Sequence, residues 1–223
     1  MGEGSLQRFI TELLREQIER WLLQQKKAWF VGANQFFYWK QFDPSSKLAP
    51  DVFILPGVKP GIKIESWKTW ETGIIPPLAV EIVSQDHLKD YRDGPPKYDE
   101  LGVKELIIFD PEFEAQRAER WRFQIFRRVG KRGLLRIENT NAEHVQSRVL
   151  GCSLRSVGTD PEMVRLRLAT GPEGKTIFPT EAEAEHAARV DAESAREAEH
   201  AARVDAESEI ARLRAELKRV SKP

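Results

Sequence analysis

The sequence predicts a mixed α/β domain at residues 1–179, followed by a charged helical tail at residues 180–223. Three observations support this fold class. An amphipathic helical pattern lies near the N-terminus, apolar segments of strand length follow it, and the tail contains neither glycine nor proline before Pro223. The chain has 223 residues with 40% apolar content, which is enough for one substantial core.

The first predicted element is an amphipathic helix that begins after Ser5, a residue type that often caps helices. Its apolar residues recur three and four positions apart, so they share one face. They are Leu6, Phe9, Ile10, Leu13, Leu14, Ile18, Trp21 and Leu22. Charged residues interrupt the same segment too often for a membrane-spanning helix or a secretory signal. We therefore expect no membrane partner.

Four apolar or aromatic segments after this helix predict β-strands. They lie at residues 28–39, 49–55, 78–84 and 105–110. The last two are almost continuous apolar runs, which is typical of central strands that are covered on both faces. Between them, Pro95 fits the first turn of a short helix and Gly102 fits the position just past its end. A strand, a helix and a strand in this order indicate two parallel strands of one sheet.

The segments at residues 120–129 and 134–138 predict a β-hairpin, because apolar and charged residues alternate on both sides of a turn that contains two glycines. Residues 148–178 hold short apolar pieces that glycine and proline interrupt. They predict strands and turns at the edge of the domain. The domain is thus expected to contain a mixed sheet flanked by helices.

The tail repeats itself, since the segment Glu183–Ser194 recurs as Glu197–Ser208 with a period of fourteen residues, or two heptads. Val190 and Val204 therefore return to one helical face. Alanine dominates that face and buries little apolar area, so at about 25 cal/mol per Å² a coiled-coil seam built from it is only marginally stable. The tail is either a dimerising coiled coil or a single solvated helix.

The charges of the chain balance, with 35 lysines and arginines against 35 aspartates and glutamates. The net charge therefore indicates neither nucleic acid nor a membrane as partner, and any electrostatic binding must be local. The single cysteine, Cys152, can form neither an internal disulfide nor a thiolate zinc site, which fits a reducing compartment. We expect a cytoplasmic protein.

Two acidic residues stand at the ends of neighbouring predicted strands. Asp51 follows Pro50 at the head of one strand, and Glu81 precedes Ile82 near the end of another. Carboxylates, together with a backbone carbonyl such as that of Ile82, are the oxygen ligands that Mg²⁺ prefers. A cation there would polarise a phosphoryl oxygen, activate a water molecule and offset the repulsion between the carboxylates. An acid from the first helix could complete the ligand shell, the options being Glu12, Glu16 and Glu19.

Simpler roles are also open for the two acids. Asp51 could cap a strand end beside its proline. Glu81 could form a structural salt bridge, because an acid inside an apolar strand is costly to bury without a partner. The pair could also be the acid and base of a sugar hydrolase, which requires a separation of about 5 to 9.5 Å and no shared metal. The sequence offers no evident aromatic platform for a sugar.

The order of these motifs resembles that of a known family. The elements are Pro50-Asp51, Glu81-Ile82-Val83-Ser84, Tyr98-x-x-x-Gly102-Val103 and Phe109-Asp110-Pro111. They are similar to those of the bacterial Uma family of predicted endonucleases, within the PD-(D/E)XK restriction-endonuclease-like superfamily. The resemblance covers residues 6–178. It implies a restriction-endonuclease-like mixed sheet, Mg²⁺ or Mn²⁺ as cofactor, and Asp51 and Glu81 as metal ligands.

The resemblance departs from the superfamily pattern at the lysine that should follow the second acid by two residues, where this chain has Val83. The implied substitute is a lysine from the following helix, and Lys97 and Lys89 are candidates by reach. Asp90, eight residues before Tyr98, matches an acidic position of the family pattern. It could orient a lysine or a metal-bound water.

The predicted hairpin carries the densest basic cluster of the chain. Its candidates for contacts with a nucleic-acid backbone are Arg127, Arg128, Lys131 and Arg132. Such a cluster can follow a phosphate backbone in a salt-dependent way. A solvated hairpin edge explains it equally well, since charge there discourages association between sheets.

The residues and the resemblance together predict a metal-dependent endonuclease that hydrolyses nucleic-acid phosphodiester bonds, with DNA as the expected substrate. The alternative is a catalytically inactive protein of the same fold that acts as an interaction or oligomerisation module, for example as a homodimer, through its C-terminal helix. Val83 in the lysine position favours this alternative.

Overall fold

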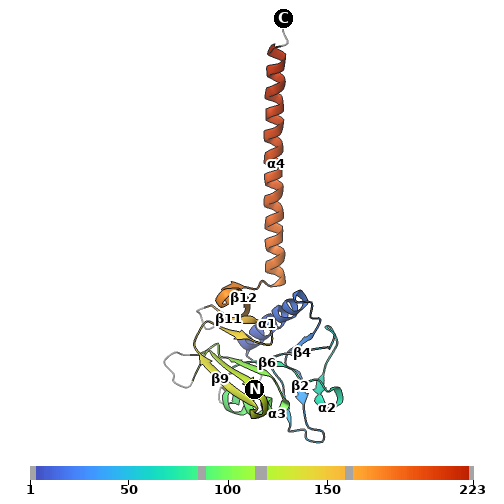
Figure 1. Ribbon diagram of the computed structural model, residues 1–223, viewed down its shortest axis with the longest axis vertical. Helices are drawn as coiled ribbons and strands as arrows, with labels where there is room; N and C mark the ends of the chain where they lie inside the picture. The colour runs from blue at the N-terminus through green and yellow to red at the C-terminus, as the bar shows by residue number, and fades with distance from the viewer. Residues whose placement is uncertain (1–3, 85–88, 114–119, 159–162, 221–223) are drawn as a thin grey trace. The chain divides into compact units, whose positions relative to one another are not determined.

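The computed structural model describes residues 4–84, 89–113, 120–158 and 163–220, apart from the side chains of Lys89 and of residues 218–220. The chain divides into two compact units, Met1–Phe178 and Pro179–Pro223 (Figure 1). The described β-strands all belong to the first unit, and the second unit is helical.

A six-stranded mixed sheet forms the centre of the first unit. Its strands, in spatial order, are β1 (Phe30–Gly32), β4 (Val52–Leu55), β6 (Leu78–Ile82), β7 (Glu105–Phe109), β8 (Phe123–Arg128) and β9 (Leu134–Thr140). β6 and β7 pair in parallel, and the other neighbours pair antiparallel. The prediction that the two apolar central strands are parallel is therefore confirmed.

The crossover between β6 and β7 contains a short π-helical segment, η1 (Lys89–Asp93), which leads into α3 (Gly94–Leu101). Proline occupies the first turn of α3. Gly102 ends the helix with a left-handed backbone, at a φ of 96°, which glycine adopts without a steric penalty. The predicted crossover helix is confirmed.

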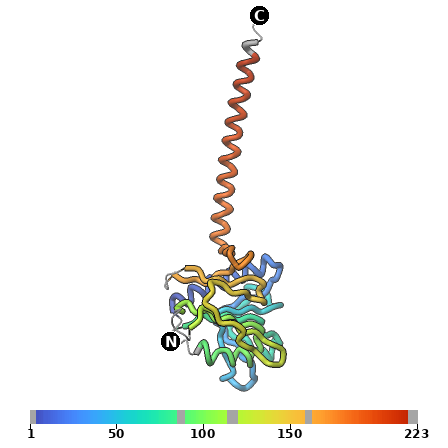
Figure 2. The backbone as a smooth tube through the Cα atoms, turned by 60° about the vertical axis from the view of Figure 1, so that its left-hand side comes forward, coloured from blue at the N-terminus to red at the C-terminus, as the bar shows by residue number. Residues whose placement is uncertain are grey.

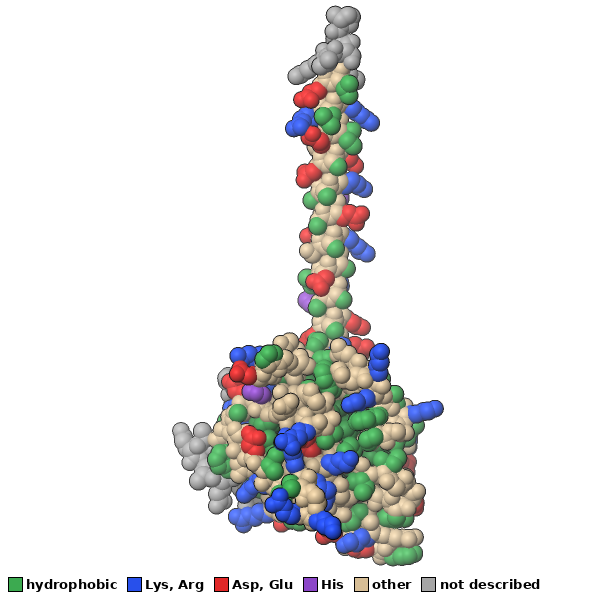
Figure 3. Space-filling model, in the orientation of Figure 1, with side chains coloured by type: hydrophobic (Ala, Val, Ile, Leu, Met, Phe, Trp, Pro, Cys, Tyr) green, Lys and Arg blue, Asp and Glu red, His purple; other side chains and the backbone are tan. Residues whose placement is uncertain are grey.

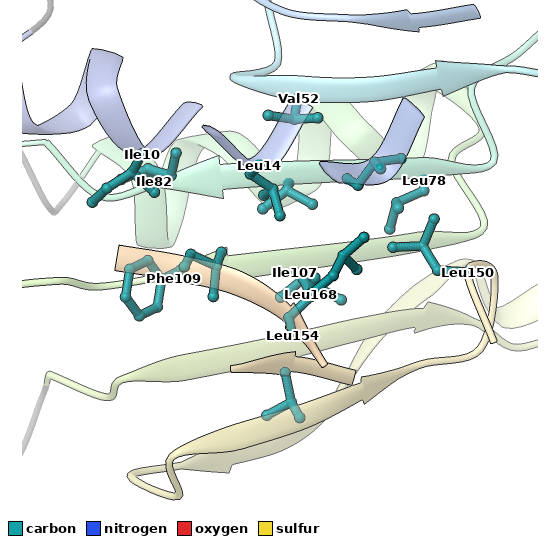
Figure 4. Close-up of a cluster of buried hydrophobic side chains, with 14 of the residues drawn as sticks. Ile10, Leu14, Val52, Leu78, Ile82, Ile107, Phe109, Leu150, Leu154 and Leu168 are labelled. Atoms are coloured by element: carbon teal, nitrogen blue, oxygen red, sulfur yellow. The ribbon is translucent and has the colours of Figure 1, made fainter. Parts of the chain in front are cut away.

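The helix α1 (Ser5–Gln24) covers one face of the six-stranded sheet together with a second, antiparallel sheet. The strands of the second sheet are β10 (His144–Ser147), β11 (Cys152–Val157), β12 (Arg165–Thr170) and β13 (Thr176–Ile177), with the 3-10 turn η3 (Pro172–Gly174) before the last. Figures 1 and 2 show α1, in blue, beside the yellow and orange strands of this sheet. Ile10 and Leu14 of α1 are fully buried and form one cluster with Val52, Ile82 and Leu168 (Figure 4). The predicted apolar stripe of the first helix thus supplies its buried face.

The opposite face of the six-stranded sheet packs against α3 and a small three-stranded sheet. The small sheet consists of β3 (Lys47–Leu48), β2 (Phe36–Tyr38) and β5 (Ser66–Lys68), and α2 (Thr69–Thr72) follows its last strand. Phe37 and Phe53 meet edge to face in this second core, with ring centroids 4.7 Å apart, and Tyr98 of α3 is buried in the same cluster. Both faces of the central strands are therefore covered.

Residues 28–39 were predicted as one strand, but they form β1 and β2 in two different sheets. Two features end the strand after Gly32. A Cβ atom at Gly32 would lie 2.2 Å from the ring of Phe53, so the backbone approaches that ring closely. Asn34 adopts a left-handed backbone, at a φ of 57°, and donates its N–H to the carbonyl of Pro50 at 2.8 Å. The chain turns here, and the turn is tied to the segment that carries Asp51.

The predicted hairpin is confirmed as β8 and β9, joined by the 3-10 turn η2 (Gly130–Arg132). The described part of residues 148–178 forms strands and turns, as predicted. Its strands do not extend the central sheet. They pair with each other and with β10 to form the second sheet. Leu154, Leu166 and Leu168 of this sheet are fully buried in the cluster that includes α1, and that burial holds the sheet on the helix side.

The second unit is a single helix, α4 (Glu181–Val220). Thr180 and Glu183 form a capping box, in which the N–H of Glu183 donates to Oγ1 of Thr180 at 3.2 Å and the N–H of Thr180 donates to Oε2 of Glu183 at 2.8 Å. Side chains 185–217 are exposed, and acidic, basic and apolar groups alternate along the helix (Figure 3). Across the described residues of both units, no helix is long and apolar enough to cross a membrane.

Candidate functional site

Asp51 and Glu81 lie opposite each other on adjacent strands. β4 and β6 pair antiparallel with Val52 opposite Val80, and the same register places Asp51 opposite Glu81. Side chains at paired positions point to the same face, with Cβ atoms about 4.5–5.5 Å apart. Asp51 is only 4% exposed, Glu81 is half-buried, and the two carboxyl groups are hydrogen-bonded to each other.

The main chain of β6 holds the Asp51 carboxylate in place. The buried N–H of Ile82 donates to Oδ2 of Asp51 at 2.6 Å. Asp51 lies one residue before β4 begins, so its side chain supplies the acceptor for the last residue of β6. Asp51 therefore does cap the end of a strand, the simple role considered for it above. The same hydrogen bond fixes the position of its carboxylate.

Gln7 approaches the same oxygens from α1. Its Nε2 lies 3.1 Å from Oδ1 and 3.3 Å from Oδ2 of Asp51, and 3.2 Å from the carbonyl oxygen of Ile82. Sequence analysis missed this residue. A signal was present, because Gln7 precedes Ile10 by three residues and Leu14 by seven, which places it on the buried face of the helix.

Glu81 receives a hydrogen bond from the hydroxyl of Tyr98, which α3 presents to the sheet. Tyr98 is 1% exposed. Lys97, the predicted catalytic lysine, precedes it on the same helix and is exposed. The side chain of α3 that reaches Glu81 is therefore that of Tyr98, and Val83, in the usual lysine position, is buried in the core beside it.

The surroundings of Glu81 favour its protonated form. Burial raises the pKa of Glu81 well above its ordinary value, and the negative charge of Asp51 raises it further, although the hydrogen bond from Tyr98 opposes this shift. Burial and the charge of Glu81 likewise raise the pKa of Tyr98 well above its ordinary value, so the hydroxyl keeps its proton. A cation beside Asp51 and Glu81 would offset the repulsion that contributes to the raised pKa of Glu81.

Asp90 stabilises the segment that follows β6. Its Oδ2 accepts hydrogen bonds from the N–H of Ser84 at 2.9 Å and from the Ser84 hydroxyl at 3.1 Å. Asp90 belongs to η1 and is 9% exposed. It thereby joins the end of β6 to the π-helical segment, a type of segment that is frequent at functional sites. The side chain of Lys89, the other predicted lysine, lies outside the described part of the structure.

A buried ion pair anchors the middle of η1 through Tyr91. Asp110, which follows β7, is fully buried and accepts two hydrogen bonds from Arg120, at 2.6 and 2.7 Å, and one from the Tyr91 hydroxyl at 2.5 Å. The hydrogen bonds with Asp110 raise the pKa of Arg120, which keeps its charge. Tyr91 adjoins Asp90 in the chain, so this ion pair helps to position the segment that borders the carboxylate pair.

The oxygens at this point suit a hard divalent cation. Within the part of the chain that the structure describes, no three His, Cys, Asp or Glu side chains are grouped closely enough to hold an ion. The available donors are the carboxylates of Asp51 and Glu81 and the carbonyl of Ile82. Mg²⁺ binds through one or two carboxylates and keeps several water molecules, so this set fits it. A cation would also offset the repulsion between the two carboxylates.

The basic residues of the hairpin occupy two kinds of position. Arg127 donates to Oε1 of buried Glu105 at 2.9 Å, and Arg128 donates to the carbonyl of Asp99 at 2.7 Å. These two guanidinium groups are bound within the protein. Lys131 and Arg132 are exposed on the turn η2. Lysine and arginine side chains are also prominent on the face of the first unit that Figure 3 shows.

A groove along α1 and β1 has a volume of about 960 Å³. Its lining includes Glu12, Glu16 and Glu19, the acids that were considered as further metal ligands. Asp51 and Glu81 do not line it. The helix therefore directs these three acids to the groove, and Gln7 is the residue of α1 that reaches the carboxylate pair.

Comparison with known proteins identifies the family. A family model named Uma2 and described as "Putative restriction endonuclease" matches residues 1–156. Among solved structures, the chain is similar to a protein of Anabaena variabilis described as a "putative nuclease", with 11% sequence identity and a TM-score of 0.43. The similarity covers 68% of this chain and 76% of the other. Comparison with curated proteins finds no match. Because the family model spans more than half of the chain, the chain belongs to the Uma2 family of restriction-endonuclease-like proteins.

Proposed function

We propose that this chain is a metal-dependent endonuclease that hydrolyses phosphodiester bonds in nucleic acid, with DNA as the expected substrate and the cytoplasm as its location. Membership of the Uma2 family supports the nuclease class. The observation that carries the proposal is the pair of opposed carboxylates, Asp51 and Glu81, on adjacent strands, where the charge of Asp51 is one of the causes that raise the pKa of Glu81.

In the proposed reaction, Asp51 and Glu81 are the ligands of Mg²⁺ or Mn²⁺, and the carbonyl of Ile82 is a third oxygen donor. A bound cation would polarise the phosphoryl oxygen and lower the pKa of a water molecule. The N–H of Ile82 fixes the orientation of Asp51, and the hydroxyl of Tyr98 fixes that of Glu81. Lys97, exposed on α3, is the proposed group that neutralises charge on the phosphate.

The exposed turn at Lys131 and Arg132 is the proposed contact with the nucleic-acid backbone. Exposed cations of this kind bind phosphate without reading sequence, and their contribution falls as salt rises. Arg127 and Arg128 support the hairpin from inside the protein through their bonds to Glu105 and Asp99. Substitution of the turn residues should therefore weaken binding to nucleic acid and leave the fold intact.

The test is cleavage of plasmid DNA, and of RNA in a parallel reaction, with Mg²⁺ or Mn²⁺. Asp51→Asn and Glu81→Gln should each reduce the rate by roughly 100-fold or more, the loss expected when one group that stabilises a transition state is removed. The matched control is Glu100→Gln, which changes an exposed carboxylate on α3. Circular dichroism verifies that each variant is folded.

Cation binding gives a second readout that does not depend on the choice of substrate. A ligand at 100 times its Kd stabilises the folded state by about 2.7 kcal/mol, which corresponds to roughly 5–11 °C in Tm for a domain of this size. The wild-type protein should show this shift with Mn²⁺, and the two variants should lose it. A wild-type protein that neither cleaves nucleic acid nor gains stability with any divalent cation would refute the proposal.

The second candidate is an interaction module that works through α4, in which case the chain is a homodimer or binds another protein. It is favoured by Val83 in place of the lysine and by the exposed apolar side chains of the tail. Those side chains are Val190, Val204, Ile210, Leu213 and Leu217. A chain that ends at Phe178 distinguishes the candidates. If the chain is an interaction module that forms a coiled coil through α4, light scattering should show that the shortened chain no longer forms oligomers. If the chain is a nuclease, the shortened chain should keep its cation-dependent cleavage.

A further inference from the structure

Gln7 occupies the point at which a cation would be expected. Its amide nitrogen lies 3.1–3.3 Å from three oxygens, which are the two carboxylate oxygens of Asp51 and the carbonyl oxygen of Ile82. Two of the three groups assigned above as metal donors thus face one side-chain nitrogen. The third donor, Glu81, is hydrogen-bonded to Asp51.

The chemistry of the amide explains why glutamine suits the metal-free protein. A glutamine amide offers two N–H donors on one nitrogen, so Gln7 can satisfy several acceptors at one place. Asp51 is almost fully buried, and a buried carboxylate that lacks donors is costly. Gln7 adds hydrogen-bond donors to the buried carboxylate of Asp51 without adding charge. An acid at this position would instead place a third carboxylate beside Asp51 and Glu81.

The same side chain can serve the cation-bound state. A half-turn of the amide group exchanges Nε2 and Oε1, and amide oxygens are good ligands for hard divalent cations. Gln7 lies in the first turns of α1, whose buried residues Ile10 and Leu14 pack in one cluster with Val52 and Ile82. The helix is thereby held against the two strands that carry the donors, so the reach of Gln7 is fixed by the core.

We propose that Gln7 closes the cation site of the metal-free protein with its amide N–H groups and becomes an amide-oxygen ligand when a divalent cation binds. This inference rests on the proposed function. It assigns the site a donor from α1, in addition to Asp51, Glu81 and the carbonyl of Ile82. It also predicts that the metal-free protein is stable, because the closing group is part of the chain.

The experiment compares wild type with Gln7→Met and Gln7→Glu by thermal unfolding in EDTA and by calorimetric titration with Mn²⁺. Methionine matches the length of glutamine but neither donates a hydrogen bond nor offers an oxygen. Glutamate offers an oxygen ligand but adds charge beside Asp51. Gln24→Glu, at the exposed end of α1 about 25 Å along the helix, is the matched control for a change of charge.

In EDTA, both Gln7 variants should unfold at a lower temperature than wild type, by at least about 2–4 °C, the shift expected from the loss of one satisfied buried group in a domain of this size. With Mn²⁺ the two variants should diverge. Gln7→Met should weaken Kd by roughly tenfold or more, and Gln7→Glu should tighten it by a similar factor, because affinity follows the number and charge of the ligands. Gln24→Glu should bind Mn²⁺ as wild type does.

Three results would overturn the inference, and they differ in what they say of the proposed function. If wild type binds Mn²⁺ and both Gln7 variants bind it equally well, Gln7 is not a ligand, while the proposed metal site stands. If neither wild type nor Gln7→Glu binds Mn²⁺, the proposed metal site fails and the ligand role of Gln7 fails with it. If Gln7→Glu alone binds Mn²⁺, the natural chain has no metal site, and the ligand role of Gln7 fails as in the second result.

Discussion

Removal of the Glu105 side chain should cost more stability than loss of any exposed ion pair of the domain. Glu105 is 1% exposed and accepts four hydrogen bonds, from Arg127 Nε at 2.9 Å, from the Ser147 hydroxyl at 2.6 Å, and from the N–H groups of Arg148 and Val149 at 3.1 and 3.2 Å. The carboxylate therefore joins β7 and β8 of the central sheet to the end of β10 in the second sheet.

Glu105→Ala would leave a guanidinium group, a hydroxyl and two main-chain N–H groups without their acceptor. Breaking a buried ion pair by removing one partner costs about 3–5 kcal/mol. In a domain of 150–250 residues each kcal/mol shifts Tm by about 2–4 °C, so the expected fall is on the order of 6–20 °C. Glu105→Gln, which keeps an acceptor oxygen but loses the charge, should give a smaller fall.

Thermal unfolding followed by circular dichroism measures this effect, with urea unfolding as a second measurement. Glu138→Ala is the control, because Glu138 is an exposed acid on β9 of the same sheet. A Tm for Glu105→Ala within about 2 °C of wild type would refute the reasoning. The result also bears on function, since Arg127→Ala should destabilise the fold. A loss of nucleic-acid binding in that variant would therefore not identify Arg127 as a phosphate contact.

Three further outcomes follow from two other buried groups. Burial, assisted by the charge of Glu105, raises the pKa of the Cys152 thiol to about 12, so iodoacetamide at pH 8 should label native protein far more slowly than urea-unfolded protein. The pKa of this thiol in the folded protein exceeds its ordinary value of 9.0, so deprotonation favours the unfolded chain. The free energy of unfolding should therefore be unaffected by this thiol below about pH 9 and should fall as the pH rises toward 12. Urea unfolding at pH 8 and pH 10 would detect the fall. Gln17 is fully buried, and its amide accepts from the N–H of Leu168 at 3.1 Å and donates to the carbonyl of Phe178. Gln17→Leu should lower the free energy of unfolding by about 1–3 kcal/mol for each group left unsatisfied, and an unchanged midpoint in urea would contradict this.

Local sequence patterns were sufficient for the elements that frame the site. The three-and-four spacing of α1 identified its buried face, and the two continuous apolar runs identified β6 and β7 as parallel central strands. The segment at residues 28–39 was predicted less well, because the close approach of Gly32 to Phe53 depends on packing between distant segments. Periodicity within a segment carries no information about such packing.

The residues of the site could be predicted only in part. Asp51 and Glu81 stood out because acids are costly inside apolar strands, and the register of β4 and β6 brings them opposite each other, while their roles as ligands stay a prediction. The partners of these acids did not stand out. Gln7 and Asp51 are 44 residues apart, and their contact depends on where α1 crosses the sheet. In the same way, the pairing of Arg127 with Glu105 follows from the register of β7 and β8, which the sequence of the hairpin does not contain.

The contacts of Gln17 also determine when the domain can be completed during synthesis. α1 leaves the ribosome before the strands of this domain, and the groups that Gln17 binds lie 151 and 161 residues further along the chain. Closing so long a loop is entropically costly, and domains with distant contacts fold slowly. The helix that carries Gln7 can pack on the central sheet earlier, but the hydrogen bonds of Gln17 cannot form until β12 and Phe178 have been made. Burial of the face of α1 that Gln17 occupies is consequently completed only after nearly the whole domain has been synthesised.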